Sequence, residues 1–471
     1  MPAKTDKPPA YAELVVQAVR QSKQPLTFDE IIAAVAKQRP ITTSSPKSTI
    51  RSALASTRLI AHNNASKYGW YPRLLRGAQV RISFSPSDLQ LDPPRIALSH
   101  EARDLLWPGF LDHKYGFNQD EIVHVTLPDD TQCQFSLKMI GSGNWFALPT
   151  PEFAQWVRTV NAREGDDFIL IGSDPEQRQY QITLDAAKTR NNAARQRRTF
   201  EVLEQGAQIV LSGRGRNIYA SWEAAHYLLA SGAMHDPVPP SPLDGIWRAI
   251  FLLAAENLQR PKSVHQLKVT LQDSKPTIWR RICVPSHWTL ATLHYVLQFA
   301  MGWTNSHLHQ FSVGEPPKQA FYSLYRDEDY DLDVKDARKT QLKTIAPHVG
   351  DHFEYEYDFG DSWRHTIEVE SISPPEAYVI YPVCLAGERA APPDDCGGVH
   401  GYADLLKVLA NTRHAEYQDS WEWVRSMKGP AWRPDYFDVA QTTQHMYCVN
   451  PKIHDAEEYA ALFRRLSEEL D

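Results

Sequence analysis

The sequence predicts an α+β protein of several domains, and three observations lead to that prediction. The chain of 471 residues is too long for a single ordinary hydrophobic core. The spacing of apolar residues changes from helical to alternating near residue 77, after which Val80, Ile82 and Phe84 alternate with polar residues. Four prolines between residues 235 and 243 would interrupt any helix or central strand.

These breaks divide the chain into six expected segments. We expect a flexible tail over residues 1–10, a helical domain with a hairpin over 11–76, a mainly β domain over 80–235, a proline-rich linker over 236–243, a connecting helix over 244–260 and an α+β domain over 262–471.

Charge is distributed unevenly along the chain. Residues 1–80 hold twelve Lys and Arg against four Asp and Glu, whereas residues 261–471 hold 21 against 31. A basic N-terminal region favours a polyanionic partner.

No run approaches the roughly 18 apolar residues of a membrane span, and the first ten residues lack the apolar core of a signal peptide. We therefore expect a cytoplasmic protein without a membrane partner. Its cysteines are only five, an odd number, which predicts reduced thiols.

The basic region begins with three expected helices. Residues 11–22 place apolar side chains at helical spacing. Residues 27–30 (TFDE) form a capping box, in which Thr27 and Glu30 satisfy backbone amides at the start of a second helix. Ser45 followed by Pro46 is typical of the start of a third helix.

The third helix is expected to present a small, polar and positive outer face. Its apolar residues Ile50, Ala53 and Leu54 should point inward, so the outer face carries Lys47, Ser48, Arg51 and Ser52. Residues 59–71 then read as two short strands around a turn, with Lys67 beside that turn. Three helices followed by a hairpin is the order of a winged helix, which binds duplex DNA with its third helix in the major groove and its hairpin against phosphate.

The same stretches carry a resemblance. Residues 24–31 (QPLTFDEI), 48–54 (STIRSAL) and 68–70 (YGW) closely resemble the HARE-HTH family, whose winged helices occur in chromatin proteins and restriction systems. The resemblance implies association with DNA and sensing of modified bases. The alternative is a winged helix that makes only protein contacts and whose positive charge is a solvated surface.

The middle region alternates apolar and polar residues in short runs, including residues 121–127 and 134–138, which favours a β barrel or sandwich. Between a strand-like and a helix-like segment, five positive charges occur in eleven residues without an acid. These cations could bind phosphate, or they could form a solvated helix face. They are Lys188, Arg190, Arg195, Arg197 and Arg198.

The acidic C-terminal region reads as strands and a helix. Leu267, Val269 and Leu271 alternate with polar residues, and residues 290–301 have helical spacing. Glutamates 354 and 356 and Asp358 alternate with three aromatic residues, so a strand there would place the carboxylates on one face and the aromatics on the other. His307 and His309 would also share a face if their segment is extended.

Histidine and aspartate side chains of this region are candidates for a divalent-metal site, with nitrogen and oxygen ligands that could activate water for phosphodiester hydrolysis. The alternative is structural, because residues 358–361 (DFGD) can form a tight turn with Asx hydrogen bonds. A divalent metal is therefore a candidate cofactor. The candidate residues are His307, His309, Asp358, Asp361 and His365.

Several motifs of this region, in order along the chain, resemble the plasmid pRiA4b ORF-three-like family. They are residues 266–271 (QLKVTL), 278–281 (IWRR), 301–303 (MGW), 306–311 (SHLHQF), 355–361 (YEYDFGD), 381–384 (YPVC), 387–389 (GER) and 392–398 (PPDDCGG). The resemblance implies a compact α+β fold carried by plasmids and insertion sequences, and no particular reaction. Family members often have a cysteine where this chain has Ala391. Only Cys384 and Cys396 remain nearby, so a local four-sulfur zinc site cannot form, although His400 could contribute. Cys396 is therefore also a candidate residue of this site.

Together these features favour a DNA-binding accessory or regulatory protein of a mobile element or defence locus. The winged helix would contact duplex DNA, and the C-terminal domain would engage a protein partner or ligand. The alternative is a metal-dependent nuclease, or another phosphodiester-acting enzyme, with its His/Asp site in the C-terminal domain, so whether the chain is an enzyme stays open. Nucleotide, dinucleotide and esterase motifs do not occur in the sequence.

Overall fold

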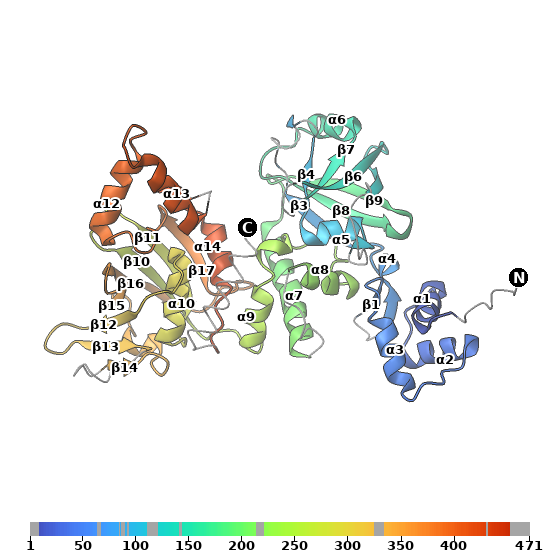
Figure 1. The fold of residues 1–471 in the computed structure, drawn as a ribbon, viewed down its shortest axis with the longest axis horizontal. Coiled ribbons are helices and arrows are strands. Elements are labelled where there is room, and N and C mark those ends of the chain that lie inside the picture. Colours follow the sequence, from blue (N-terminus) through green and yellow to red (C-terminus); the bar gives the residue numbers. More distant parts are fainter. Residues whose placement is uncertain are drawn as a thin grey trace, which may run out of the picture. The chain divides into compact units, whose positions relative to one another are not determined.

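The computed structural model describes residues 9–63, 67–83, 85, 90–91, 94–110, 121–140, 144–212, 221–324, 334–429 and 432–452. The chain divides into two units, residues 1–247 and 248–471 (Figure 1). Most of the predicted tail, the hairpin turn at 64–66 and Phe84 lie outside the described residues. None of the helices within the described ranges is long and apolar enough to cross a membrane.

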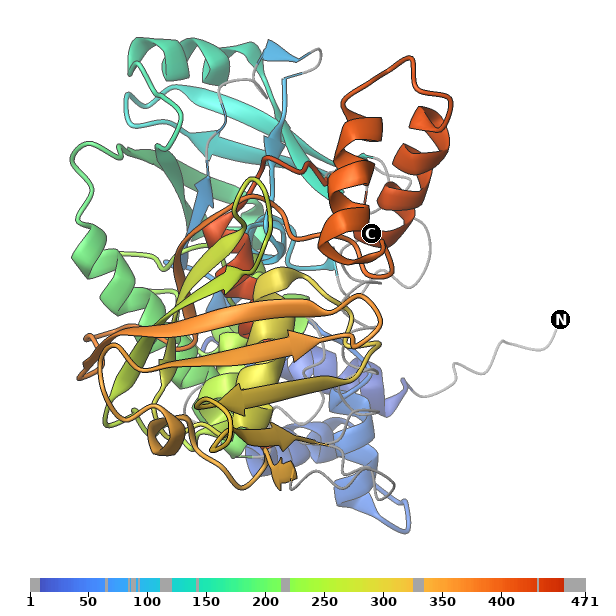
Figure 2. The ribbon, with the colours of Figure 1, turned by 90° about the vertical axis from the view of Figure 1, so that its left-hand side faces the viewer.

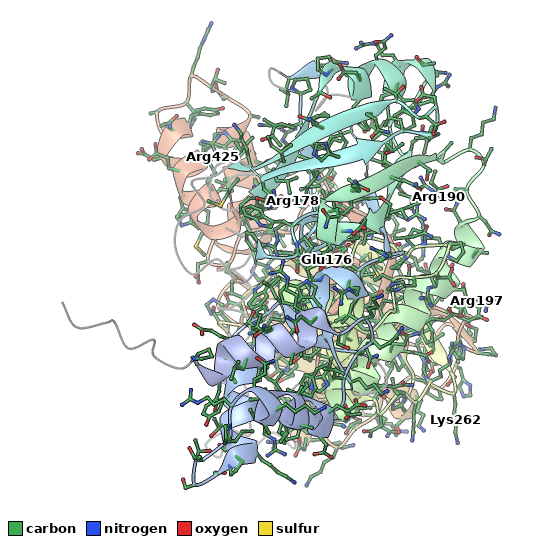
Figure 3. All side chains as sticks on the ribbon, turned by 90° about the vertical axis from the view of Figure 1, so that its right-hand side faces the viewer. Glu176, Arg178, Arg190, Arg197, Lys262 and Arg425 are labelled. Carbon is green, nitrogen blue, oxygen red and sulfur yellow. The ribbon has the colours of Figure 1, made fainter. Side chains whose placement is uncertain are left out.

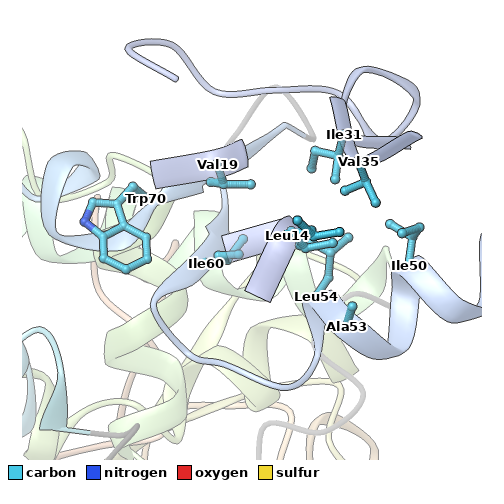
Figure 4. Packing of buried hydrophobic residues seen from close by; sticks show 10 residues of the cluster. Leu14, Val19, Ile31, Val35, Ile50, Ala53, Leu54, Ile60 and Trp70 are labelled. Atoms are coloured by element: carbon cyan, nitrogen blue, oxygen red, sulfur yellow. The ribbon is translucent and has the colours of Figure 1, made fainter. Parts of the chain in front are cut away.

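The first unit begins with three helices and an antiparallel hairpin. They are α1 (Tyr11–Gln21), α2 (Phe28–Gln38), α3 (Pro46–Leu54), β1 (Ile60–His62) and β2 (Tyr68–Trp70). Leu26, between α1 and α2, forms an antiparallel bridge to Tyr68 and so joins the hairpin to the helices. Apolar side chains from all these elements form one core, which includes Val19, Ile31 and Trp70 (Figure 4).

The predicted helix starts can be compared with the structure. The capping box of α2 is confirmed, because Thr27 Oγ1 accepts from the backbone of Glu30 and the Glu30 carboxylate accepts from the backbone of Thr27. Helix α3 begins at Pro46 as predicted, but the side chain of Ser45 makes no capping hydrogen bond.

After a short helix, α4 (Tyr71–Leu74), the unit continues into a seven-stranded sheet with the order β3-β8-β9-β5-β6-β7-β4. Strands β5 and β9 are parallel, and the other neighbours are antiparallel. The strands are β3 (Gln79–Ser83), β4 (Ile96–Ala97), β5 (Glu121–Thr126), β6 (Gln132–Ile140), β7 (Asn144–Pro149), β8 (Asp167–Asp174) and β9 (Gln179–Asp185); α5 (His100–Leu106) and α6 (Pro151–Thr159) lie between them in the chain.

The mainly β prediction for residues 80–235 holds only as far as residue 185. Two helices follow, α7 (Asn192–Leu211) and α8 (Ser221–Ala230), and α8 packs against α5. The sequence signal for α7 is weak because this helix is polar over most of its surface, which weakens the apolar periodicity that identifies a helix.

The proline-rich segment packs against the first unit rather than spanning freely between domains. Pro239 and Pro240 are buried, and their carbonyl oxygens accept hydrogen bonds from the Arg81 guanidinium. Arg81 is 3% exposed and also pairs with the carboxylates of Asp167 and Asp185. A buried guanidinium needs this many partners because it cannot lose its charge.

The second unit contains an eight-stranded sheet with the order β14-β13-β12-β15-β16-β10-β11-β17, antiparallel except for β13 and β14. Its elements are α9 (Ala249–Ala255), β10 (Val264–Leu271), β11 (Trp279–Pro285), α10 (Leu290–Met301), β12 (His309–Val313), β13 (Ala320–Ser323), β14 (Val334–Asp336), α11 (Leu342–Ile345), β15 (His352–Tyr357), β16 (Trp363–Ser373), β17 (Val383–Glu388), α12 (Gly398–Leu409), α13 (Tyr417–Lys428) and α14 (Val439–Met446).

Helix α10 covers one face of this sheet and is buried along its whole length (Figure 2). The alternation predicted for residues 354–359 is present in β15, where Tyr355 and Tyr357 are buried and Glu354 is exposed. It ends at Asp358, which has a φ of +57°, and Phe359 is exposed rather than buried. The strand therefore stops at Tyr357, and Asp358 begins a turn.

Candidate functional site

The outer face of α3 matches the sequence analysis residue by residue. Lys47, Ser48, Arg51 and Ser52 are all exposed, whereas the three apolar residues of the helix are buried. The Arg51 guanidinium lies 5.3 Å from the ring centroid of Phe28, whose ring lies 6.4 Å from that of Tyr68 in β2. This row of side chains connects the charged face of α3 to the hairpin.

Lys67 is half-buried beside the hairpin turn, next to Tyr68. Partial burial raises the pKa of the Tyr68 phenol, and the nearby charge of Arg51 opposes that shift. The positive charge of Lys67 contributes to lowering the pKa of Glu30, after the hydrogen bonds from Thr27. The predicted DNA-facing residues of α3 and the hairpin therefore lie in one neighbourhood.

The five cations between residues 188 and 198 are mostly engaged within the protein. Arg190 is 8% exposed and lies 3.0 Å from both Asp167 Oδ2 and Asp185 Oδ2, while Arg195 lies 3.7 Å from the same Asp167 oxygen. Arg197 and Arg198 both pair with Glu201.

Figure 3 labels Arg190 before α7 and Arg197 on that helix. Arg198 also donates to the carbonyl of Ala233. Lys188 is exposed. The four arginines thus pair with carboxylates, including the buried Asp167, and anchor α7. This favours the structural interpretation over binding of phosphate.

In the second unit three side chains converge where two turns meet. His307 Nε2 lies 3.3 Å from Asp395 Oδ1 and 3.6 Å from Asp358 Oδ2. His307 precedes β12, Asp358 follows β15, and Asp395 lies in the loop before α12. Potential ligand atoms of all three lie within 4.8 Å of one another. We call this group the His–Asp cluster.

Local structure holds Asp358 in place and brings its turn against the loop of Asp395. Asp358 Oδ1 accepts from the backbone of Gly360, so the predicted Asx turn is present and leaves Oδ2 facing His307. The turn contacts the 395–398 loop, because Asp361 Oδ2 accepts from the backbone of Gly397. Gly398 is required at this contact, since a Cβ there would lie 2.4 Å from the Asp361 carbonyl oxygen and its φ is +65°.

The other predicted histidines do not reach the cluster. His309 and His365 are buried, and their ring Nε2 atoms have no hydrogen-bond partner among the described residues. His309 stacks on His294 of α10 with 3.4 Å between ring centroids. Burial lowers the pKa of His365 to about 4 and that of His294 to about 3. These rings are neutral parts of the core.

Asp394, beside the cluster, is 3% exposed. Its Oδ2 accepts from Thr304, whereas Oδ1 has no hydrogen-bond partner within the described ranges. Burial raises the pKa of this carboxyl, while the charges of Lys428 and His307 oppose the shift. Burial lowers the pKa of Lys428 to about 8, partly offset by Asp394.

The comparisons with known proteins concern this part of the chain. A model of the plasmid pRiA4b ORF-3-like protein family matches residues 263–441. An uncharacterized protein of Sinorhizobium fredii, y4hQ, is 38% identical over 165 residues, which cover 82% of that protein and 35% of this chain. The chain belongs to the plasmid pRiA4b ORF-3-like family. A solved structure, a protein of unknown function from Methanosarcina mazei, is 35% identical, with 97% of that chain and 38% of this one covered and a TM-score of 0.34.

The whole His–Asp cluster lies inside the part of the chain that matches the plasmid pRiA4b ORF-3-like family. Cys396 of the same loop is not a member of it. Burial raises the pKa of the Cys396 thiol to about 12 and that of Cys384 to about 11, so both remain protonated thiols. Neither is bonded to another cysteine. Thiols in this state are poor metal ligands, because a metal binds the thiolate.

Sequence reasoning missed Asp395. It lies in the 392–398 motif, whose two prolines and two glycines surround a pair of acids. That pattern indicates a shaped loop with a carboxylate at a fixed position, which is the signal that could have found it. The pairing of this loop with His307, 88 positions earlier, has no counterpart in local spacing.

Proposed function

We propose that this protein is a DNA-binding accessory or regulatory protein, in which residues 11–76 form a winged helix that contacts duplex DNA. The observation that carries the proposal is the division of α3 into a buried apolar face and an exposed face with Lys47 and Arg51. A helix that presents short polar side chains and cations to solvent can enter the major groove without burying an unpaired acid.

Two further features support this proposal. The element order, three helices followed by an antiparallel hairpin, is that of winged-helix proteins. Residues 1–80 carry an excess of eight positive charges, which would attract a polyanionic partner such as DNA. The resemblance to the HARE-HTH family leads to the same proposal and adds modified bases as ligands.

The family domain has a different role in this proposal. Residues 261–471 carry ten more negative than positive charges, so phosphate should be repelled over a Debye length of about 8 to 10 Å. We assign to this domain the binding of a protein partner or ligand. The plasmid in the family's description supports a mobile element as the setting.

Binding of the full chain to a labelled duplex, followed by fluorescence anisotropy, tests the proposal. K47E/R51E should weaken binding strongly, because it replaces attraction by repulsion on the face that meets DNA. The matched control is K23E/K37E, which reverses two exposed charges of the same module away from α3. Equal losses in both variants would reject α3 as the contact surface, provided thermal melting shows that both remain folded.

A further inference from the structure

The His–Asp cluster has a geometry that hydrogen bonding within the protein does not account for. A charged N–H donor normally lies about 2.7 to 2.9 Å from a carboxylate oxygen. His307 Nε2 lies 3.3 Å from one carboxylate and 3.6 Å from the other, and neither contact is a hydrogen bond. The nitrogen is buried and has no hydrogen-bond partner in the described part of the chain.

We propose that His307, Asp358 and Asp395 bind one divalent transition-metal ion. Metal bonds from imidazole nitrogen and carboxylate oxygen are about 2.0 to 2.2 Å long, so two ligand atoms in a tetrahedral site lie about 3.4 Å apart. The observed separations of 3.3 and 3.6 Å agree with that edge. An ion at the centre would satisfy all three side chains at once.

The surroundings of the cluster contain a second unpaired group. The Asp394 carboxylate is almost completely buried, and its Oδ1 has no hydrogen-bond partner in the described residues. A buried carboxylate oxygen without a partner is costly. Asp394 directly precedes Asp395 in the chain, so the cluster lies beside this carboxylate. A bound dication there would compensate it.

The ligand set indicates which ions fit. Imidazole favours zinc, iron, nickel and copper, whereas magnesium and calcium favour oxygen ligands alone. The imidazole therefore favours zinc over magnesium, and the two carboxylates also suit manganese, which binds oxygen ligands. Three protein ligands also leave a coordination position open, as in catalytic rather than structural zinc sites. The side chain of Asp395 is 63% exposed, so that position is accessible from solvent.

Isothermal titration calorimetry of the tag-free full chain with Zn²⁺, Mn²⁺ and Mg²⁺ tests this site. H307Q and D395N each remove one ligand. The matched control is H287Q, because His287 Nε2 also lies beside a carboxylate, 3.4 Å from Glu256 Oε2, but belongs to no group of three potential ligands among the described residues. D395N alters an exposed side chain and should fold normally, so the test does not depend on H307Q remaining folded.

We expect one saturable Zn²⁺ or Mn²⁺ site in the parent and in H287Q, and weaker Mg²⁺ binding. Loss of an outer-shell partner already weakens metal binding about 10- to 100-fold, so removing a ligand should weaken it at least about 10-fold in H307Q and D395N. The proposal is overturned if the parent shows no saturable binding. It is also overturned if H307Q and D395N bind as tightly as H287Q.

Discussion

The salt dependence of DNA binding gives a quantitative test of the surface assigned to α3. The helix exposes two cations, Lys47 and Arg51, and replacing both by glutamine removes two charges without introducing repulsion. Each neutralised phosphate contributes about 0.9 to the slope of log affinity against log salt concentration. The slope of K47Q/R51Q should therefore be smaller in magnitude by about 1.8. From about 50 to about 200 mM salt, the ratio of the parent's DNA affinity to that of K47Q/R51Q should therefore fall about 12-fold.

Anisotropy titrations of the full chain at four or five salt concentrations give both slopes. S48A/S52A is a neutral control on the same helix face, so it should change affinity without changing the slope. K23Q/K37Q removes two exposed charges elsewhere in the module. An unchanged slope in K47Q/R51Q, or an equal reduction in K23Q/K37Q, would refute the assignment of α3 to the phosphate backbone.

Four further predictions concern stability. R81M should lower the unfolding free energy of the first unit by about 3 to 5 kcal/mol in denaturant titrations, because it leaves Asp167 buried with less compensation. Burial lowers the pKa of His294 in the folded protein to about 3, so the second unit should lose stability as the pH falls below about 6.5. The loss from this histidine should be about 1.4 kcal/mol per pH unit, and H294Q should reduce that pH dependence. G398A should lower the melting temperature, because the added Cβ meets a backbone oxygen; an unchanged value would mean that the two turns separate without cost. A fragment 248–471 should melt higher than a fragment 263–471, since Trp288 Nε1 donates to Glu256 in the segment that the shorter fragment lacks.

The last prediction concerns the boundary of the C-terminal domain, where the division of the structure differs from the expected segments. The sequence placed the break at the prolines and treated residues 244–260 as a connection. In the structure the prolines pack on the first unit, and α9 belongs to the second. Arg81 decides this, because its guanidinium bonds to two proline carbonyls 158 and 159 positions later. Proline content indicates where a helix or strand must end, but it does not show what the segment packs against.

Local patterns were sufficient wherever a residue's neighbours in sequence fix its environment. The capping box at Thr27 and Glu30, the start of α3 at Pro46 and the inward face of that helix follow from backbone hydrogen bonding and from the 3.6-residue period. The alternation in β15 follows in the same way from the two-residue period of a strand. The family of the C-terminal domain could likewise be identified from ordered motifs.

The candidate site in that domain depended on long-range contacts. The sequence grouped His307 with His309 and His365, because residue type and spacing were the only guides. Tertiary structure separates them, since the sheet turns His309 onto His294 of α10 and His365 toward Trp303 and Tyr355. Burial keeps both rings neutral there. It brings His307 to Asp395 instead, through a loop that only a glycine at 398 allows to approach the 358–362 turn. The sequence by itself determined which side chains were available; the close approach of two distant turns decided which of them meet, because such contacts depend on packing rather than on local periodicity.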